Sequence, residues 1–214
     1  MSLAGRAFAR VRPRLPMVLR DPPELFLAKN SALRTTGWLR SRREHASVND
    51  AGEPIPWITY AAMRFLEPRV GKDLRVFEFG SGYSTLWWAK RVNRVVAVEH
   101  DAEWHKRMAD RVPVNAELRF AVGDDYIRSA IGETYDIIVN DGIRRPDCAI
   151  HSVKSLRPGG VYVWDNTNER ADEDGHRYLE QAGFKRLDFW GMCPLMVMES
   201  CTSVFYREKN CLAI

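Results

Sequence analysis

The sequence lacks any run of about eighteen apolar residues, the length that a membrane-spanning helix needs. Its beginning also lacks the uninterrupted apolar stretch and the small-residue cleavage site of a secretory signal peptide. The 214 residues are 45% hydrophobic and 28% charged, which is typical of one soluble domain with a full core. We therefore expect a cytoplasmic protein with no transmembrane segment.

Cysteine is scarce as well. The four cysteines, Cys148, Cys193, Cys201 and Cys211, form no C-x-x-C pair. This spacing predicts neither a zinc site nor a disulfide framework. We expect four free thiols, as in a reducing compartment.

Acidic residues are rare in the N-terminal part of the chain. Residues 1–43 contain ten Arg or Lys residues and two acids, so this part carries a charge of +8 and the rest a charge of −4. We interpret residues 1–45 as a basic, partly flexible arm, because Pro13 and Pro16 would interrupt a long amphipathic helix. Such an arm is suited to nucleic acid, anionic lipid or an acidic partner. Its composition also resembles that of an organelle transit peptide.

From Leu74 onward, short β-branched and aromatic runs alternate with helical stretches, which is typical of an α/β fold with a mostly parallel sheet. The expected strands cover residues 74–80, 94–100, 116–123, 135–141, 159–166, 184–191 and 201–208. The expected helices cover residues 84–92, 102–112, 124–132, 146–156 and 172–183. The connection between the last two strands is too short for a crossover helix, so we expect an antiparallel hairpin there.

These elements predict a Rossmann-like, doubly wound, mostly parallel seven-stranded sheet that ends in an antiparallel hairpin and occupies residues 74–214. Residues 46–73 combine a turn-rich loop with a helix from about Trp57 to Leu66. We expect this helical segment to cover the sheet edge or the mouth of a ligand site. The domain therefore carries an N-terminal extension of helices and loops.

Glycine or polar residues stand where each of the first five expected strands ends. In an open parallel sheet, ligands bind beyond the carboxyl ends of the strands, where the strand order reverses. The residues at these ends are Gly80, Gly82, Glu99, Asp124, Asp141, Asp165 and Asn166. Their common position predicts a ligand site at this edge of the sheet.

The stretch "VFEFGSGYST", residues 76–85, joins the first strand to a helix through Gly80 and Gly82. The two glycines permit close backbone approach, and the first N–H groups of the helix favour an anionic part of a ligand. Glu99 follows Gly82 by 17 residues, where an acid can accept hydrogen bonds from both hydroxyls of a ribose. A nucleoside-containing ligand is therefore predicted. The NAD fingerprint requires a third glycine where Thr85 stands, which disfavours a dinucleotide.

Five segments occur in order over about residues 74–166. They are "VFEFGSGYST", the acidic end of "VVAVEH", "VGDDY", "YDIIVNDG" and "LRPGGVYVWDN". Together they resemble the motifs of the class I S-adenosylmethionine-dependent methyltransferases, although the third glycine frequent in that family is Ser84 here. The resemblance implies S-adenosylmethionine as cofactor and methyl transfer as activity.

The resemblance also implies a role for each matching residue. The residues implied to surround the methionine part of the donor are Glu78, Gly80, Gly82 and Ser84. Glu99 would hold the ribose, and Asp124 would contact the adenine amino group. His100, which directly follows the ribose acid, would pack on the adenine ring.

Asp141, Asp165 and Asn166 offer three oxygen ligands suited to Mg²⁺ or Ca²⁺. They resemble the site of metal-dependent O-methyltransferases, in which the cation binds the acceptor oxygen and favours its deprotonation. The lysine that acts as base in that subgroup falls near Arg144, and arginine stays protonated. Arg144 and Arg145 are therefore expected to orient a carboxylate or phosphate of the acceptor. In the alternative without metal, the catalytic residue Asp141 faces the methyl donor while Asp165 and Asn166 cap a turn.

The leading functional hypothesis is O-methylation of a small-molecule or glycan-type acceptor, with Mg²⁺ assistance as one variant. Aromatic residues available to line an acceptor pocket are Trp57, Tyr60, Tyr83 and Trp164. The alternatives are an RNA methyltransferase or RNA-binding protein that uses the basic arm, an NAD-dependent oxidoreductase, and a donor-binding domain without turnover. The acceptor and the oligomeric state stay open at this point.

Overall fold

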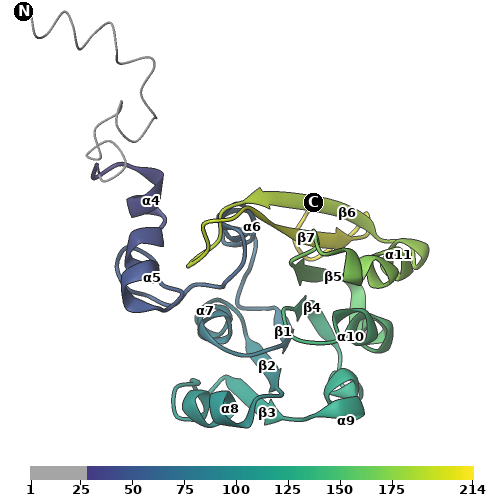
Figure 1. The fold of residues 1–214 in the computed structure, drawn as a ribbon. Helices are drawn as coiled ribbons and strands as arrows, with labels where there is room; N and C mark the ends of the chain where they lie inside the picture. The colour runs from purple at the N-terminus through teal and green to yellow at the C-terminus, as the bar shows by residue number, and fades with distance from the viewer. Residues whose placement is uncertain (1–27) are drawn as a thin grey trace, which may run out of the picture.

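The computed structural model describes residues 28–214, and in this part of the chain seven strands form one sheet in the order β3-β2-β1-β4-β5-β7-β6 (Figure 1). The strands are β1 (Arg75–Phe79), β2 (Arg94–Glu99), β3 (Ala116–Phe120), β4 (Tyr135–Asn140), β5 (Leu156–Asp165), β6 (Lys185–Gly191) and β7 (Ser200–Tyr206). Strands β1 to β5 pair in parallel, whereas β7 pairs antiparallel with both β5 and β6. The predicted doubly wound sheet and its terminal hairpin are confirmed.

Helices cover both faces of the sheet. On one side lie α6 (Tyr60–Leu66), α7 (Tyr83–Arg91) and α8 (Ala102–Ala109), and on the other lie α9 (Gly123–Arg128), α10 (Arg145–Ser152) and α11 (Glu173–Gln181) (Figure 1). Two short 3₁₀ helices, η2 (Val153–Ser155) and η3 (Arg170–Asp172), complete the connections near β5. Because β1 pairs with both β2 and β4, the strand order reverses at β1, and the carboxyl ends of these strands meet at one edge.

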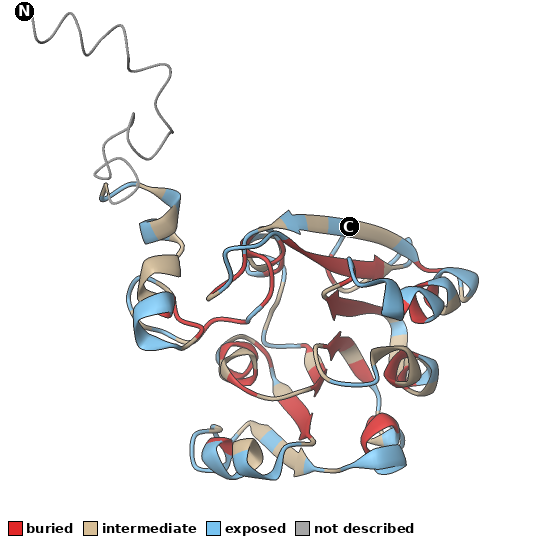
Figure 2. Ribbon diagram, in the orientation of Figure 1, coloured by how far each residue is buried: buried red, intermediate tan, exposed pale blue. Residues whose placement is uncertain are grey.

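The core has two layers because alternate residues of each strand point to opposite faces of the sheet. Val76 and Ile137 pack with Trp87 and Leu66 on the α6 and α7 side. Phe77 packs on the other side with the residues of α9, α10 and α11. The central strands are buried almost throughout, which explains why they read as nearly continuous apolar runs (Figure 2).

The N-terminal extension contains α4 (Ala32–Thr35) and α5 (Trp38–Glu44) before α6. The predicted helix begins at Tyr60 instead of Trp57, because the side chain of Thr59 accepts a hydrogen bond from the N–H of Ala62 and caps the helix. The predicted basic arm, residues 1–45, lies largely outside the described residues. Within residues 28–214, no helix is both long and apolar enough to span a bilayer.

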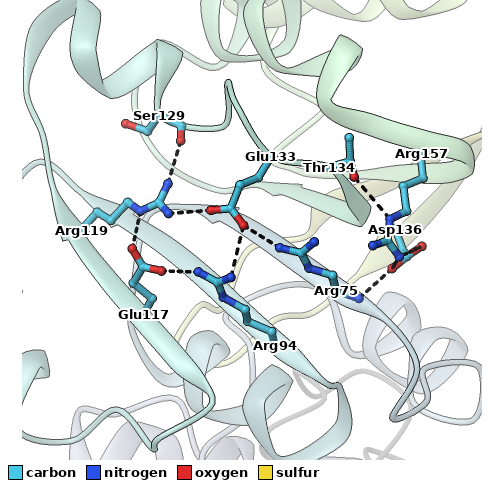
Figure 3. Close-up of polar contacts among 9 residues, drawn as sticks. All are labelled: Arg75, Arg94, Glu117, Arg119, Ser129, Glu133, Thr134, Asp136 and Arg157. Carbon is cyan, nitrogen blue, oxygen red and sulfur yellow. Dashed lines mark hydrogen bonds and ion pairs between the residues drawn. The ribbon is translucent and has the colours of Figure 1, made fainter.

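A network of charged side chains links the amino-terminal ends of β1 and β2 to β3 and to the connection before β4 (Figure 3). The carboxylate of Glu133 accepts hydrogen bonds from Arg75 (2.6 Å), Arg119 (2.8 Å) and Arg94 (3.2 Å). Glu117 bridges Arg119 and Arg94. These bonds tie β1, β2 and β3 together through charges that are only partly exposed.

We expect Glu133→Gln to lower the free energy of unfolding by about 1–2 kcal/mol at low salt, because three guanidinium groups lose their shared anion. For a chain of this length the melting temperature should fall by about 3–6 °C. Calorimetry at low salt measures the effect, with the exposed Glu180→Gln on α11 as control. High salt should shrink the difference. A Glu133→Gln variant that melts like the wild type at low salt would show that the network contributes no stability.

Candidate functional site

The turn after β1 brings two strand ends into close contact. Gly80 has a φ of 88°, and a Cβ there would lie 2.7 Å from the carbonyl oxygen of Asp141. A side chain is thus excluded at Gly80 by the backbone that follows β4. Gly82 has an extended backbone, and a Cβ there would make only ordinary contact, 3.6 Å from the ring of Trp104. The close approach of the Asp141 backbone alone therefore requires a glycine at position 80, whereas no neighbouring backbone requires one at position 82.

Glu78 is a buried carboxylate on β1. Its Oε2 atom accepts a hydrogen bond from the hydroxyl of Thr85, and its Oε1 atom has no hydrogen-bond partner among the described residues. Burial raises the pKa of Glu78 to about 7, although the hydroxyls of Ser84 and Thr85 act in the opposite direction. An unpartnered buried oxygen of this kind is costly in the free protein, and it fits a cationic group of a ligand.

Glu99 ends β2 and holds the two neighbouring turns together. Its Oε2 atom accepts hydrogen bonds from the backbone N–H and the hydroxyl of Ser81, at 3.1 and 3.0 Å. Its Oε1 atom accepts from the backbone N–H groups of His100 and Asp101, at 2.8 and 2.9 Å. The carboxylate is only 4% exposed, so its position is fixed before any ligand arrives.

Two cavities adjoin at this edge of the sheet. The smaller one, of about 250 Å³, is lined by Glu78, Gly80, Ser81, Ser84, Glu99, His100, Asp141, Gly142 and Ile143. The larger one, of about 650 Å³, also contacts Ser81, Ser84 and Asp141 and extends toward Trp57, Asp165 and Asn166. Asp141 therefore stands where the two cavities meet.

Asp141 and Asp165 are two carboxylates whose pKa values are both raised. Burial, and then the charge of Asp165, raises the pKa of Asp141 well above its usual range, and Arg145 opposes this shift. Burial raises the pKa of Asp165 to about 6, against the hydrogen bond that its carboxylate accepts from Thr202. This pair is suited to accepting a proton near neutral pH.

A positively charged side chain of the protein already lies among the oxygen atoms that were predicted to hold a metal. The guanidinium Nη2 of Arg145 donates a hydrogen bond of 2.8 Å to Asn166 Oδ1 and lies 3.7 Å from Asp141 Oδ1. Among residues 28–214, no group of three or more His, Cys, Asp or Glu side chains is arranged to hold a metal ion. Because this guanidinium lies between Asp141 and Asn166, the residues present do not fit Mg²⁺ there.

The structure brings most of the predicted site residues together, and Asp124 is the exception. Its side chain is 66% exposed, forms an ion pair of 3.2 Å with Arg144, and lines neither cavity. Of the four aromatic residues expected to line an acceptor pocket, two lie at the larger cavity and two do not. Trp57 and Tyr83 border the larger cavity, whereas Tyr60 and Trp164 are buried in the core.

The sequence alone did not indicate several residues at the site, among them Ser81, Trp104 and Ile143. Ser81 lines both cavities, and its place between Gly80 and Gly82 is the sequence signal that marks it. Trp104 reaches back from α8 and donates a hydrogen bond of 2.7 Å to the carbonyl of Ser81. Ile143 borders the smaller cavity from the loop after β4. No local pattern reveals Trp104 or Ile143, because their place depends on the packing of separate elements.

All four cysteines are free thiols, as expected.

Solved structures of methyltransferases share this fold. A putative caffeoyl-CoA O-methyltransferase from Staphylococcus aureus aligns with a TM-score of 0.56 at 12% identity, over 86% of this chain and 96% of its own. A precorrin-6y C5,15-methyltransferase from Geobacter metallireducens aligns with a TM-score of 0.54 at 14% identity, over 68% and 87%. A methyltransferase from Pyrococcus furiosus aligns with a TM-score of 0.53 at 19% identity, over 69% and 80%. No family model and no curated protein matches the sequence.

The chain therefore has the fold of the class I S-adenosylmethionine-dependent methyltransferases. The fold predicted from the sequence motifs is confirmed. Its two adjoining cavities lie at the carboxyl ends of the strands, where an α/β sheet of this kind binds its ligands.

Proposed function

We propose that this protein is an S-adenosylmethionine-dependent methyltransferase that methylates an oxygen of a small-molecule or glycan-type acceptor. The observation that carries the proposal is the pair of adjoining cavities that share Ser81, Ser84 and Asp141. A donor in the smaller cavity and an acceptor in the larger one would meet at Asp141. Such an arrangement aligns the two reactants, which is the main requirement of an in-line transfer.

The smaller cavity has the polar groups that the donor needs. The free Oε1 atom of Glu78 would bind the ammonium group of the methionine part, which passes beside Gly80 and Ser84 and reaches Gly82 at the border of the larger cavity. Glu99 would accept hydrogen bonds from the ribose hydroxyls. When bound, the donor supplies an electrophilic methyl group on a sulfonium.

The adenine end of the donor is assigned to two residues. His100 lines the smaller cavity beside Glu99 and would pack against the base. Asp124 would contact the adenine amino group once its carboxylate turns from Arg144 toward the cavity.

The larger cavity favours a neutral acceptor with several hydroxyl groups. Four carboxylates line it, those of Asp141, Asp165, Glu169 and Glu199, and no Lys or Arg among the described residues does. These acceptor groups bind hydroxyls and repel phosphates. Trp57, which is 46% exposed, offers a flat apolar face for a sugar-like ring. The same acidity argues against an RNA acceptor at this cavity.

The segment that we propose as a cap contributes to the same cavity. Ala46, Ser47 and Trp57 line it from one side, while Cys193 and Met196 line it from the β6–β7 connection. Residues 46–73 would therefore help to select the acceptor, and residues 74–214 would form the donor-binding domain.

Asp141 is the residue proposed to accept the proton of the acceptor hydroxyl. Its carboxylate borders both cavities, and Arg145 lies beside it on the protein side. Because the pKa of Asp141 is raised, the carboxylate is a stronger base than an ordinary aspartate.

The test is a transfer assay with S-adenosylmethionine and a panel of neutral glycosides, their phosphorylated counterparts and simple phenols, with methylated product detected by mass spectrometry. We expect product from neutral acceptors and little from phosphorylated ones. Asp141→Asn should lower kcat/KM at least about 100-fold, because a positioned base contributes that much or more. A protein that binds the donor and methylates no acceptor of the panel would contradict the proposed transfer and favour the donor-binding domain without turnover.

A further inference from the structure

Arg145 is held in place by its backbone and by its position at the start of α10. The preceding residue, Arg144, has a left-handed backbone with a φ of 50°, and the carbonyl of Arg145 accepts a hydrogen bond of 2.9 Å from the side chain of Asn140. The Arg145 side chain is only 18% exposed. Its guanidinium group is therefore a fixed part of the site, unlike an ordinary surface arginine.

The guanidinium group of Arg145 lies among oxygen atoms from several segments. It donates to Asn166 Oδ1 at 2.8 Å and lies 3.7 Å from Asp141, 3.7 Å from Glu169 and 3.8 Å from Asp172. Because the charges of three carboxylates converge on this one guanidinium, it balances much of the negative charge at this end of the larger cavity.

Asn166 is held toward Arg145 from the other side. It has a left-handed backbone with a φ of 60°, which costs about 1 kcal/mol or more for a residue other than glycine. Its amide nitrogen donates a hydrogen bond of 3.2 Å to the hydroxyl of Ser200, so its amide oxygen faces the guanidinium. The local strain is offset by these two hydrogen bonds.

We infer that the guanidinium group of Arg145 takes the place of a divalent cation between Asp141 and Asn166, so that the site works without a metal. A guanidinium matches this role because it keeps its charge at all working pH values and donates in several directions. Arg145 lines neither cavity, so its guanidinium is not placed to bind the acceptor oxygen as a metal would. Arg145 acts instead through Asp141, which it keeps in place and whose pKa it lowers against the effect of burial, and it is a positioning residue.

The effect of Arg145 on catalysis rests on the proposed function. The position of its guanidinium group among the oxygen atoms of Asp141 and Asn166 does not. If the arginine holds the place of a cation, then removing its charge should leave Asp141, Asp165 and Asn166 free to bind a metal ion. Oxygen ligands of this kind suit Mn²⁺, which electron paramagnetic resonance detects directly. This measurement needs neither donor nor acceptor, so a failure of methyl transfer leaves it unaffected.

The experiment titrates Mn²⁺ into the full-length wild type and into the variants Arg145→Ala, Arg145→Lys and Arg144→Ala. Arg144→Ala is the matched control, because it removes an equal charge from the adjacent residue, whose guanidinium pairs with Asp124 and Asp147 instead. We expect stoichiometric Mn²⁺ binding only in Arg145→Ala, with an affinity at least about 10-fold higher than in the other three proteins. The double variant Arg145→Ala/Asp141→Asn should lose this binding.

Two results would overturn the inference. One is a Mn²⁺ site in the wild type that Asp141→Asn removes, and the other is Mn²⁺ binding by Arg145→Ala that is no stronger than that of the wild type. Circular dichroism and the melting temperature check the fold of each variant, and Arg145→Gln replaces Arg145→Ala if the latter does not fold. In the transfer assay, Arg145→Ala should also shift the pH profile of kcat to higher pH, and Arg145→Lys should restore most of that shift.

Discussion

Glu99→Ala is expected to weaken the binding of S-adenosylmethionine about 100-fold, or about 2.7 kcal/mol. The variant loses the carboxylate proposed to accept hydrogen bonds from the ribose, and bonds to a charged group contribute about 1.5–3 kcal/mol each. It also leaves the backbone N–H groups of Ser81, His100 and Asp101 without their present acceptor. Calorimetric titration with the donor measures the change.

A matched variant separates these two effects. Ser81→Ala removes only the hydroxyl that donates to Glu99 at 3.0 Å and leaves the carboxylate in place. We expect it to weaken donor binding less than about 10-fold. If Glu99→Ala binds the donor as tightly as the wild type does, the ribose assignment is wrong. If both variants lose binding equally, then the role of Glu99 is to hold the turn.

Glu78→Gln is expected to raise stability and lower donor affinity at the same time. The pKa of Glu78 is about 7 in the folded protein and ordinarily 4.5. Between these values the folded state binds more protons than the unfolded state, so the free energy of unfolding falls as pH rises from about 4.5 to 7. The loss is on the order of 3 kcal/mol and is complete above pH 7. The glutamine side chain never ionises, so the Glu78→Gln variant does not lose this stability as the pH rises.

Urea unfolding at pH 5 and pH 8 measures this difference. At pH 8 we expect Glu78→Gln to be more stable than the wild type by about 1–3 kcal/mol, and at pH 5 by much less. Because the pKa values of Asp141 and Asp165 are also raised, Asp141→Asn and Asp165→Asn serve as controls for the part of the pH dependence that Glu78 does not cause. Donor binding at pH 8 should be at least about 10-fold weaker in Glu78→Gln, because the methionine ammonium loses its anion. Equal stability gains at both pH values, or unchanged donor affinity, would contradict this role.

The fold could be predicted from the sequence because its signals are local. Short apolar runs and alternating helices predicted the strands, and the short final connection predicted the hairpin. Some element boundaries differ from the predicted ones. Strand β3 ends at Phe120 and not at residue 123, since Gly123 begins α9. Strand β5 begins at Leu156, three residues before its expected start, and pairs with Tyr135 beyond an irregularity in the register.

The candidate site could be predicted only in part. Residues at strand ends, such as Glu78, Glu99 and Asp141, are brought together by the topology alone. The partners that control their chemistry come from distant parts of the chain or from the far side of a turn. Thr202, which donates to Asp165, lies 37 residues away. Arg145 was expected to face an acceptor, and the packing of α10 against the loop after β5 turns it toward Asn166 instead.

A methyl-donor site at the end of β1 is tested most directly by calorimetric titration of the wild-type protein with S-adenosylmethionine and, separately, with NAD, each with and without Mg²⁺. We expect saturable binding of S-adenosylmethionine, none of NAD, and no effect of Mg²⁺ on either. Binding of NAD in preference to S-adenosylmethionine, or no binding of S-adenosylmethionine under any of these conditions, would contradict a methyl-donor site at the end of β1.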